Sequence, residues 1–119
     1  MQITINSKEY GLNFGVAFIR EIDKISGMKM NLNGELQNFG LSMMRVLPGL
    51  QSRNVAVLSD VIYAAAWDNR KRPSRRDVDD MIDDPKTDLK KLFADVTKAM
   101  NQANAVKVVT EVVTKNVKA

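Results

Sequence analysis

Histidine and cysteine are both absent from this chain of 119 residues. The absence of cysteine excludes a disulfide framework and suits a reducing compartment. Because both residues are missing, the usual soft metal ligands are gone, which excludes a structural zinc site. The commonest general base near neutral pH is missing as well. No motif combines a nucleophile, a base and oxyanion donors, so we expect a protein that is not an enzyme and that holds no cofactor and no metal.

Aromatic residues are also scarce, at 6% of the chain, so the core must depend on Leu, Ile, Val, Ala and Met. No signal-peptide pattern opens the sequence, and no apolar run approaches the roughly 20 residues that a membrane span needs. The formal net charge of +4 tolerates an anionic partner without demanding one. We therefore expect a soluble intracellular protein without a membrane partner.

The periodicity of apolar residues predicts a mainly α fold, a small bundle of about five helices with an N-terminal β-hairpin. Alternation over residues 2–12 predicts the hairpin, with Asn6 and Ser7 in its turn. Helical stripes predict helices over residues 14–26, 35–49, 54–67, 74–84 and 87–104. The third of these helices is the most apolar, so we expect it to be the most buried.

Residues at the ends of these stretches agree with helix boundaries. Asn13 and Asn54 are suitable N-caps. Ser74 followed by Asp77 is a variant of the capping box. Pro48 followed by Gly49 should end the second helix, because proline cannot continue the hydrogen-bond ladder.

The last 15 residues are rich in valine, and we separate them, as residues 105–119, from a helical domain of residues 1–104. The spacing of the apolar positions suits a helix, whereas the composition suits a strand, so both forms remain open. Either form must bury its apolar surface. We favour an intermolecular contact over packing in cis by a narrow margin. The candidate contact residues are Val106, Val109, Val113 and Val117.

Methionine is frequent, with seven residues, and its flexible side chain suits adaptable contacts. Within the pair in the second predicted helix, we assign Met43 to the core. Met44 stays a candidate for partner binding.

The stretch AAAWDNRKRPSRRDVDDMIDD, residues 64–84, combines the only tryptophan with a basic and an acidic block. We expect Trp67 to be a buried structural anchor. The basic block consists of Arg70, Lys71, Arg72, Arg75 and Arg76. No aromatic residue lies among these cations to stack on bases, and the aspartates that follow balance the charge. We interpret the segment as a structural joint and consider nucleic acid an unlikely partner; the alternative is a small basic nucleic-acid-binding protein that uses the five cations.

Two segments resemble one known family. ITINSKEYGLNFGVAFIREIDK and LSDVIYAAAWDNRKRPSRRDVDDMIDD are similar to segments of the tail assembly chaperones of long-tailed bacteriophages that infect Gram-positive bacteria. The resemblance is carried by family patterns of the form I-x-(I/V)-N-x-K-x-Y-x-L-x-F, A-x-W, R-P-S and D-(I/V)-D. The matching residues are Ile3, Ile5, Asn6, Lys8, Tyr10, Leu12, Phe14, Ala65, Trp67, Arg72, Pro73, Ser74, Asp77, Val78 and Asp79.

The resemblance implies a role in the cytoplasm of the host cell. Such chaperones bind the long hydrophobic tape measure protein and keep it soluble. They help recruit the major tail protein and leave before the tail is finished, and many are also made in a longer, frameshifted form. Apolar contacts from Met and Val suit a binder that must release its client.

Overall fold

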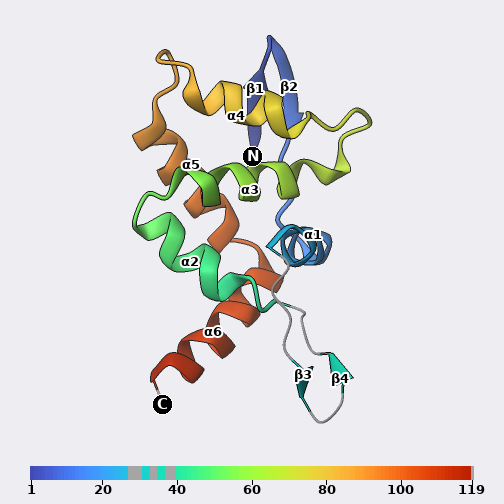
Figure 1. Cartoon of the computed structure of the whole chain (residues 1–119), viewed down its shortest axis with the longest axis vertical. Helices are drawn as coiled ribbons and strands as arrows, with labels where there is room; N and C mark the ends of the chain where they lie inside the picture. Colours follow the sequence, from blue (N-terminus) through green and yellow to red (C-terminus); the bar gives the residue numbers. More distant parts are fainter. Residues whose placement is uncertain (27–30, 33–34, 37–39, 119) are drawn as a thin grey trace.

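The structure, a computed structural model, describes residues 1–26, 31–32, 35–36 and 40–118 (Figure 1). This part of the chain is mainly helical and begins with a β-hairpin, as predicted. In chain order the elements are β1 (Gln2–Ile5), β2 (Lys8–Gly11), α1 (Val16–Ser26), β3 (Asn31–Leu32), β4 (Glu35–Leu36), α2 (Met43–Gln51), α3 (Val55–Ala65), the 3-10 helix η1 (Ala66–Asp68), α4 (Arg75–Asp83), α5 (Leu89–Asn101) and α6 (Asn104–Lys118).

The N-terminal hairpin forms where the alternation predicted it. β1 and β2 pair antiparallel, with Ile5 opposite Lys8. Asn6 and Ser7 both have positive φ angles, of 53° and 64°, which a two-residue hairpin turn of the primed type requires. Ile3 and Ile5 are buried, and β1 contacts α4. The hairpin therefore covers the bundle with one apolar face.

Helix α1 starts two residues later than predicted. Asn13 does not cap the first turn; its Oδ1 accepts a hydrogen bond of 3.0 Å from the backbone N–H of Gly15. Phe14 is buried and meets Phe18 edge to face, with 5.1 Å between the ring centroids. The chain enters α1 through this turn because Phe14 is anchored in the core ahead of the helix.

The prediction of a helix over residues 35–49 is wrong at both ends. Glu35 and Leu36 lie in β4, and α2 begins only at Met43. Gly40 has a φ of 79°, a conformation that interrupts any helix through this point. The carboxylate of the buried Asp23 on α1 accepts hydrogen bonds from the backbone N–H groups of Gly40 and Ser42, at 2.7 and 3.1 Å. A side chain from another helix thus sets the start of α2.

Pro48 and Gly49 do not end α2, which continues to Gln51. The end is set by Arg53, whose φ is 58°. Its N–H bonds to the carbonyl of Leu50, and the N–H of Asn54 bonds to the carbonyl of Gly49, the pattern of a Schellman motif. A Cβ on Gly49 would lie 2.7 Å from a side-chain carbon of Val57. Glycine therefore allows α2 to approach α3 closely.

Helix α3 is the centre of the bundle and contacts α1, α2 and α4 (Figure 1). Asn54 caps it as predicted, accepting hydrogen bonds from the N–H groups of Ala56 and Val57. Most of its length is buried, as its composition predicted. The buried residues are Val57, Leu58, Ser59, Asp60, Val61, Ile62, Ala64 and Ala65.

The capping box at the start of α4 is confirmed, with Ser74 and Asp77 bonding reciprocally to each other's backbone N–H groups. The valine-rich tail is a helix, α6, and not a strand. It contacts α1, α2 and α5, so its first turns belong to the same packed body as the rest of the bundle.

Candidate functional site

Arg72 of the basic block is partly buried and bonds to groups of the protein itself. Its Nε and Nη2 donate to the carbonyl oxygen of Tyr63 at 3.1 and 2.8 Å, and its Nη1 donates to Glu21 at 2.8 Å. The guanidinium lies 3.9 Å from the centre of the Tyr63 ring. Burial alone would raise the pKa of Glu21, but hydrogen bonds from Lys24 and Arg72 outweigh it and hold that pKa below its usual value. Arg72 therefore joins α1 to the end of α3.

Arg75 makes a second such contact. It donates to the carboxylate of Asp60, and its guanidinium carbon lies 5.0 Å from the centre of the same Tyr63 ring. Asp60 is buried and also accepts a hydrogen bond of 3.0 Å from Arg45. This carboxylate in the middle of α3 thus ties α2 and α4 to the central helix.

The remaining cations of the block are Arg70, Lys71 and Arg76, which are exposed. Arg76 lies 3.8 Å from Asp80. We expected the following aspartates to balance the whole block, but Arg72 and Arg75 pair instead with Glu21 and Asp60. Their donors are turned toward protein acceptors, which favours a structural role for the joint over binding of nucleic acid.

Trp67 lies in η1 and is only partly buried, whereas we expected a buried anchor. Its Nε1 is shielded from solvent and has no hydrogen-bond partner among the residues that the structure describes. Asn69, two residues on, bonds to both backbone groups of Gly11. The segment around Trp67 is therefore the point where the hairpin is fastened to α3.

Three of the aspartates that follow make structural contacts, two within their own segment and one to α3. Asp77 completes the capping box, Asp79 accepts a hydrogen bond from Ser59 on α3, and Asp88 caps α5. Within the described ranges, no group of three or more acidic side chains could hold a metal ion.

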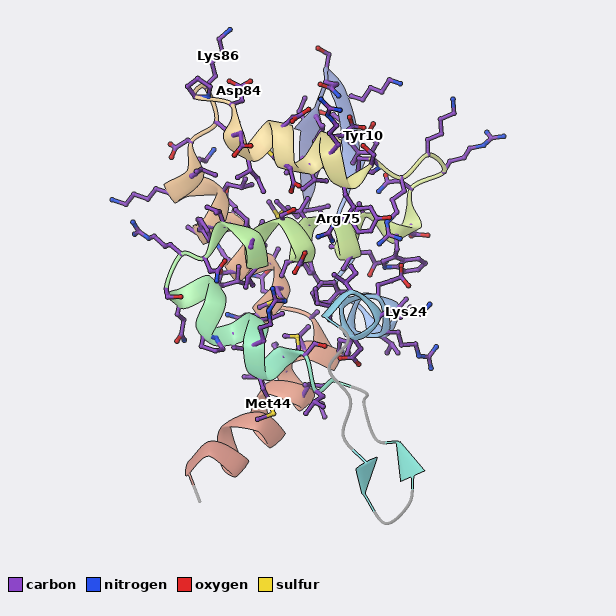
Figure 2. The ribbon with its side chains drawn as sticks, viewed as in Figure 1. Tyr10, Lys24, Met44, Arg75, Asp84 and Lys86 are labelled. Carbon is purple, nitrogen blue, oxygen red and sulfur yellow. The ribbon has the colours of Figure 1, made fainter. Side chains whose placement is uncertain are left out.

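The two methionines of α2 have different environments. Met43 is fully buried, whereas 42% of Met44 is exposed. Figure 2 shows Met44 beside the place where α2 meets α6. Met44 is therefore available to a partner and Met43 is not.

The valines of α6 also differ in their burial. Val106 is fully buried within the chain itself, and Val109 is partly buried against Gly40. Val108 is 62% exposed. The side chains of Val113 and Val117 lie outside the described set. The C-terminal end of α6 extends beyond the outline of the other helices (Figure 1).

One family model matches almost the whole sequence. It is described as phage tail assembly chaperone protein, TAC, and it covers residues 2–115. The chain belongs to the phage tail assembly chaperone family. Comparison with curated proteins and with solved structures gave no significant match.

Membership of the family confirms the resemblance to tail assembly chaperones and gives the chain a general role in the assembly of phage tails. A chaperone role is a non-enzymatic one, and it implies partners among the tail proteins. None of the helices in the described ranges combines the length and apolar character that crossing a bilayer requires.

The sequence did not reveal the partners of the arginines, namely Glu21, Asp60 and the Tyr63 carbonyl. For Asp60 an ion pair could have been predicted, because a carboxylate in the middle of an otherwise apolar helix needs a charged partner when it is buried. Nothing in the sequence around Glu21 indicated a buried ion pair, because a glutamate on a polar helix face is ordinarily exposed.

Proposed function

We propose that this chaperone binds the tape measure protein of a phage of Gram-positive bacteria and keeps it soluble in the host cytoplasm until the tail assembles. The observation that supports this is that two large apolar side chains, Met44 on α2 and Val108 on α6, are exposed on helices that contact each other. Neither side chain is needed to close the core, since the neighbouring Met43 and Val106 do that. A contiguous apolar patch that a fold leaves uncovered is a typical mark of a binding site, and we propose that Met44 and Val108 belong to such a patch.

The extended end of α6 belongs to the same proposal. Val113 and Val117 lie in this part of the sequence, and we propose residues 112–119 as an interaction element. The sequence of this element is rich in valine, and an apolar contact of this kind suits a client that must later be released. A second copy of the chain is the other partner that this element could take, and sedimentation of the purified protein distinguishes the two.

Co-expression with the tape measure protein tests the proposal. The wild-type chain should leave that protein in the soluble fraction, and Met44→Asp combined with Val108→Asp should leave it insoluble. Val16→Asp combined with Val55→Asp is the matched control, because both valines are exposed apolar residues at the starts of other helices. A tape measure protein that is equally soluble with all three chains contradicts the proposal.

We further propose that the complex, and not the free chaperone, recruits the major tail protein. An immobilised chaperone should capture major tail protein only when tape measure protein is also present. Capture of equal amounts without tape measure protein contradicts this part of the proposal.

A further inference from the structure

A groove between the end of α2 and the face of α5 combines an apolar floor with a basic rim. At the floor lie Leu50 and Phe93, core residues of which only 4% and 6% are exposed, and Ala94 and Thr97 lie beside them. Arg53, Lys90 and Lys98 surround it, and Gln51 completes the lining. Among the described residues, none of those that line this groove is acidic.

The rim cations differ from several other arginines of the described residues in their ion pairs. Arg45, Arg72 and Arg75 each pair with a carboxylate inside the bundle. Arg53, Lys90 and Lys98, in contrast, form no ion pair with any residue in the part of the chain that the structure describes. Three positive charges around one apolar floor therefore remain for a partner to neutralise.

The backbone at Arg53 gives a second reason to regard the rim as more than a solvated surface. Its φ of 58° places it at the left-handed position of the Schellman motif, where glycine is the usual residue. An arginine at this position is disfavoured by contact between its Cβ and the backbone. Strained positions of this kind are often kept for what the side chain does.

We propose that the α2–α5 groove binds an acidic amphipathic helix of the client, an inference that rests on the function proposed above. The apolar stripe of such a helix would cover Leu50 and Phe93. Carboxylates on its flanks would lie against Arg53, Lys90 and Lys98. Opposite charges around an apolar centre give both affinity and selectivity at an interface.

The chain's own acidic and C-terminal segments do not fit the groove. Helix α4 is acidic, but its apolar residues Val78 and Ile82 are buried in cis. The C-terminal segment carries Lys107, Lys115 and Lys118 in its sequence, which the basic rim would repel. The occupant is therefore an external segment and not a second copy of this chain.

A second hollow, on the other side of α5, is lined by charges of both signs and provides control positions. Lys91 lines this hollow together with Asp88 and Asp95. Lys86 lies on the loop before α5 and points away from the body (Figure 2). Lys86 and Lys91 are thus matched control positions for Lys90 and Lys98, with the same charge and no place in the groove.

The test uses the full chain and two synthetic helices of about 18 residues, long enough for five turns. Both carry the same stripe of leucines; one has glutamate and the other lysine on its flanks. Backbone NMR of the labelled chain should show shifts around Arg53, Phe93 and Lys98 with the glutamate helix only. Lys90→Ala combined with Lys98→Ala should weaken that binding about three- to tenfold, the sum of two exposed ion pairs. Equal binding of both helices overturns the proposal, as does an equal loss in Lys86→Ala combined with Lys91→Ala.

Arg53→Gly adds a readout that partial unfolding cannot imitate. Glycine suits the left-handed backbone better than arginine, so this variant should melt at a higher temperature than the wild type and still bind the glutamate helix more weakly. Unchanged affinity in Arg53→Gly contradicts the proposal.

Tape measure solubility separates this inference from the function on which it rests. If the wild-type chain does not keep the tape measure protein soluble, the proposed function fails. If it does so while the glutamate helix produces no shifts at the groove, the groove proposal alone fails.

Discussion

Arg72 stacks on the ring of Tyr63, 3.9 Å from its centre, and donates two hydrogen bonds to the carbonyl oxygen of the same residue. One arginine thereby recognises a side chain and a backbone group at the end of α3, while its third contact reaches Glu21 on α1. The basic joint, which a charge count alone presents as a phosphate-binding surface, is fastened to the bundle at this point.

Arg72→Ala should destabilise the fold by about 2–3 kcal/mol, because the variant loses charge-assisted hydrogen bonds and a cation–π contact. The stability of Arg72→Lys should lie between those of Arg72→Ala and the wild type, since lysine keeps the charge but cannot donate in a planar fork. Urea unfolding measures all three. Arg70→Ala, at an exposed position, is the control and should stay within about 0.5 kcal/mol of the wild type; a similar loss in both alanine variants contradicts the structural role of Arg72.

The contribution of Glu21 should depend on pH. Its pKa in the folded protein is lowered from the reference value of 4.5. A lowered pKa means that the ionised group stabilises the fold above the unfolded-state pKa and that this contribution is lost as the pH falls through the folded-state pKa. The wild type should therefore be more stable than Glu21→Gln at pH 7, and the difference should shrink below pH 4.5. A difference in unfolding free energy that stays constant from pH 7 to below pH 3 would rule this out.

Trp67→Ala should cost about 2–4 kcal/mol, less than the largest core truncations because the indole is only partly buried. Trp67→Phe should cost less than about 1 kcal/mol, since Nε1 has no hydrogen-bond partner to lose among the described residues. Chemical denaturation compares the two variants. A loss below about 1 kcal/mol in Trp67→Ala would make the tryptophan a candidate contact for a partner instead of an anchor.

The chain should not bind duplex or single-stranded DNA at ~50 mM salt, where phosphate contacts are strong. Arg72 and Arg75 already donate to Glu21, Tyr63 and Asp60. Titration of labelled DNA followed by anisotropy checks this. Micromolar binding that disappears when Arg70, Lys71 and Arg76 are changed to alanine would establish the nucleic-acid-binding alternative.

The two halves of α6 should respond differently to truncation. A chain that ends at Asn104 loses the buried Val106 and should be strongly destabilised, in line with large core losses. A chain that ends at Glu111 keeps Val106 and Val109 and should remain folded by circular dichroism while it loses tape measure binding. If the chain ending at Glu111 retains full binding, residues 112–119 are not an interaction element.

Several features that depend on neighbours in the sequence were predictable, although the cap at Asn13 and the helix end at Pro48 were not. The caps at Asn54 and Ser74 and the turn at Asn6 and Ser7 follow from local hydrogen bonding and local backbone preferences. The periodicity of α3 and the helical spacing in α6 predicted a buried helix and an amphipathic one. For α6, periodicity outweighed the β propensity of valine, because its first turns bury one stripe against α1, α2 and α5.

Features that depend on distant residues were not predictable. The start of α2 is set by Asp23, 19 positions before Ser42, and the pairing of Arg72 with Glu21 spans 51 positions. Apolar spacing gives no sign of either contact. The groove between α2 and α5 is lined by residues from two separate parts of the sequence. In the sequence alone, its cations therefore look like ordinary solvated charges.

The central claim is that the chain binds the tape measure protein directly. Tape measure protein of the same phage, co-expressed with the tagged wild-type chain and purified through the tag, should elute with it as a soluble complex on size-exclusion chromatography. The Met44→Asp/Val108→Asp variant should elute alone. Tape measure protein that never elutes with the wild-type chain, or that elutes equally with this variant, would contradict the account.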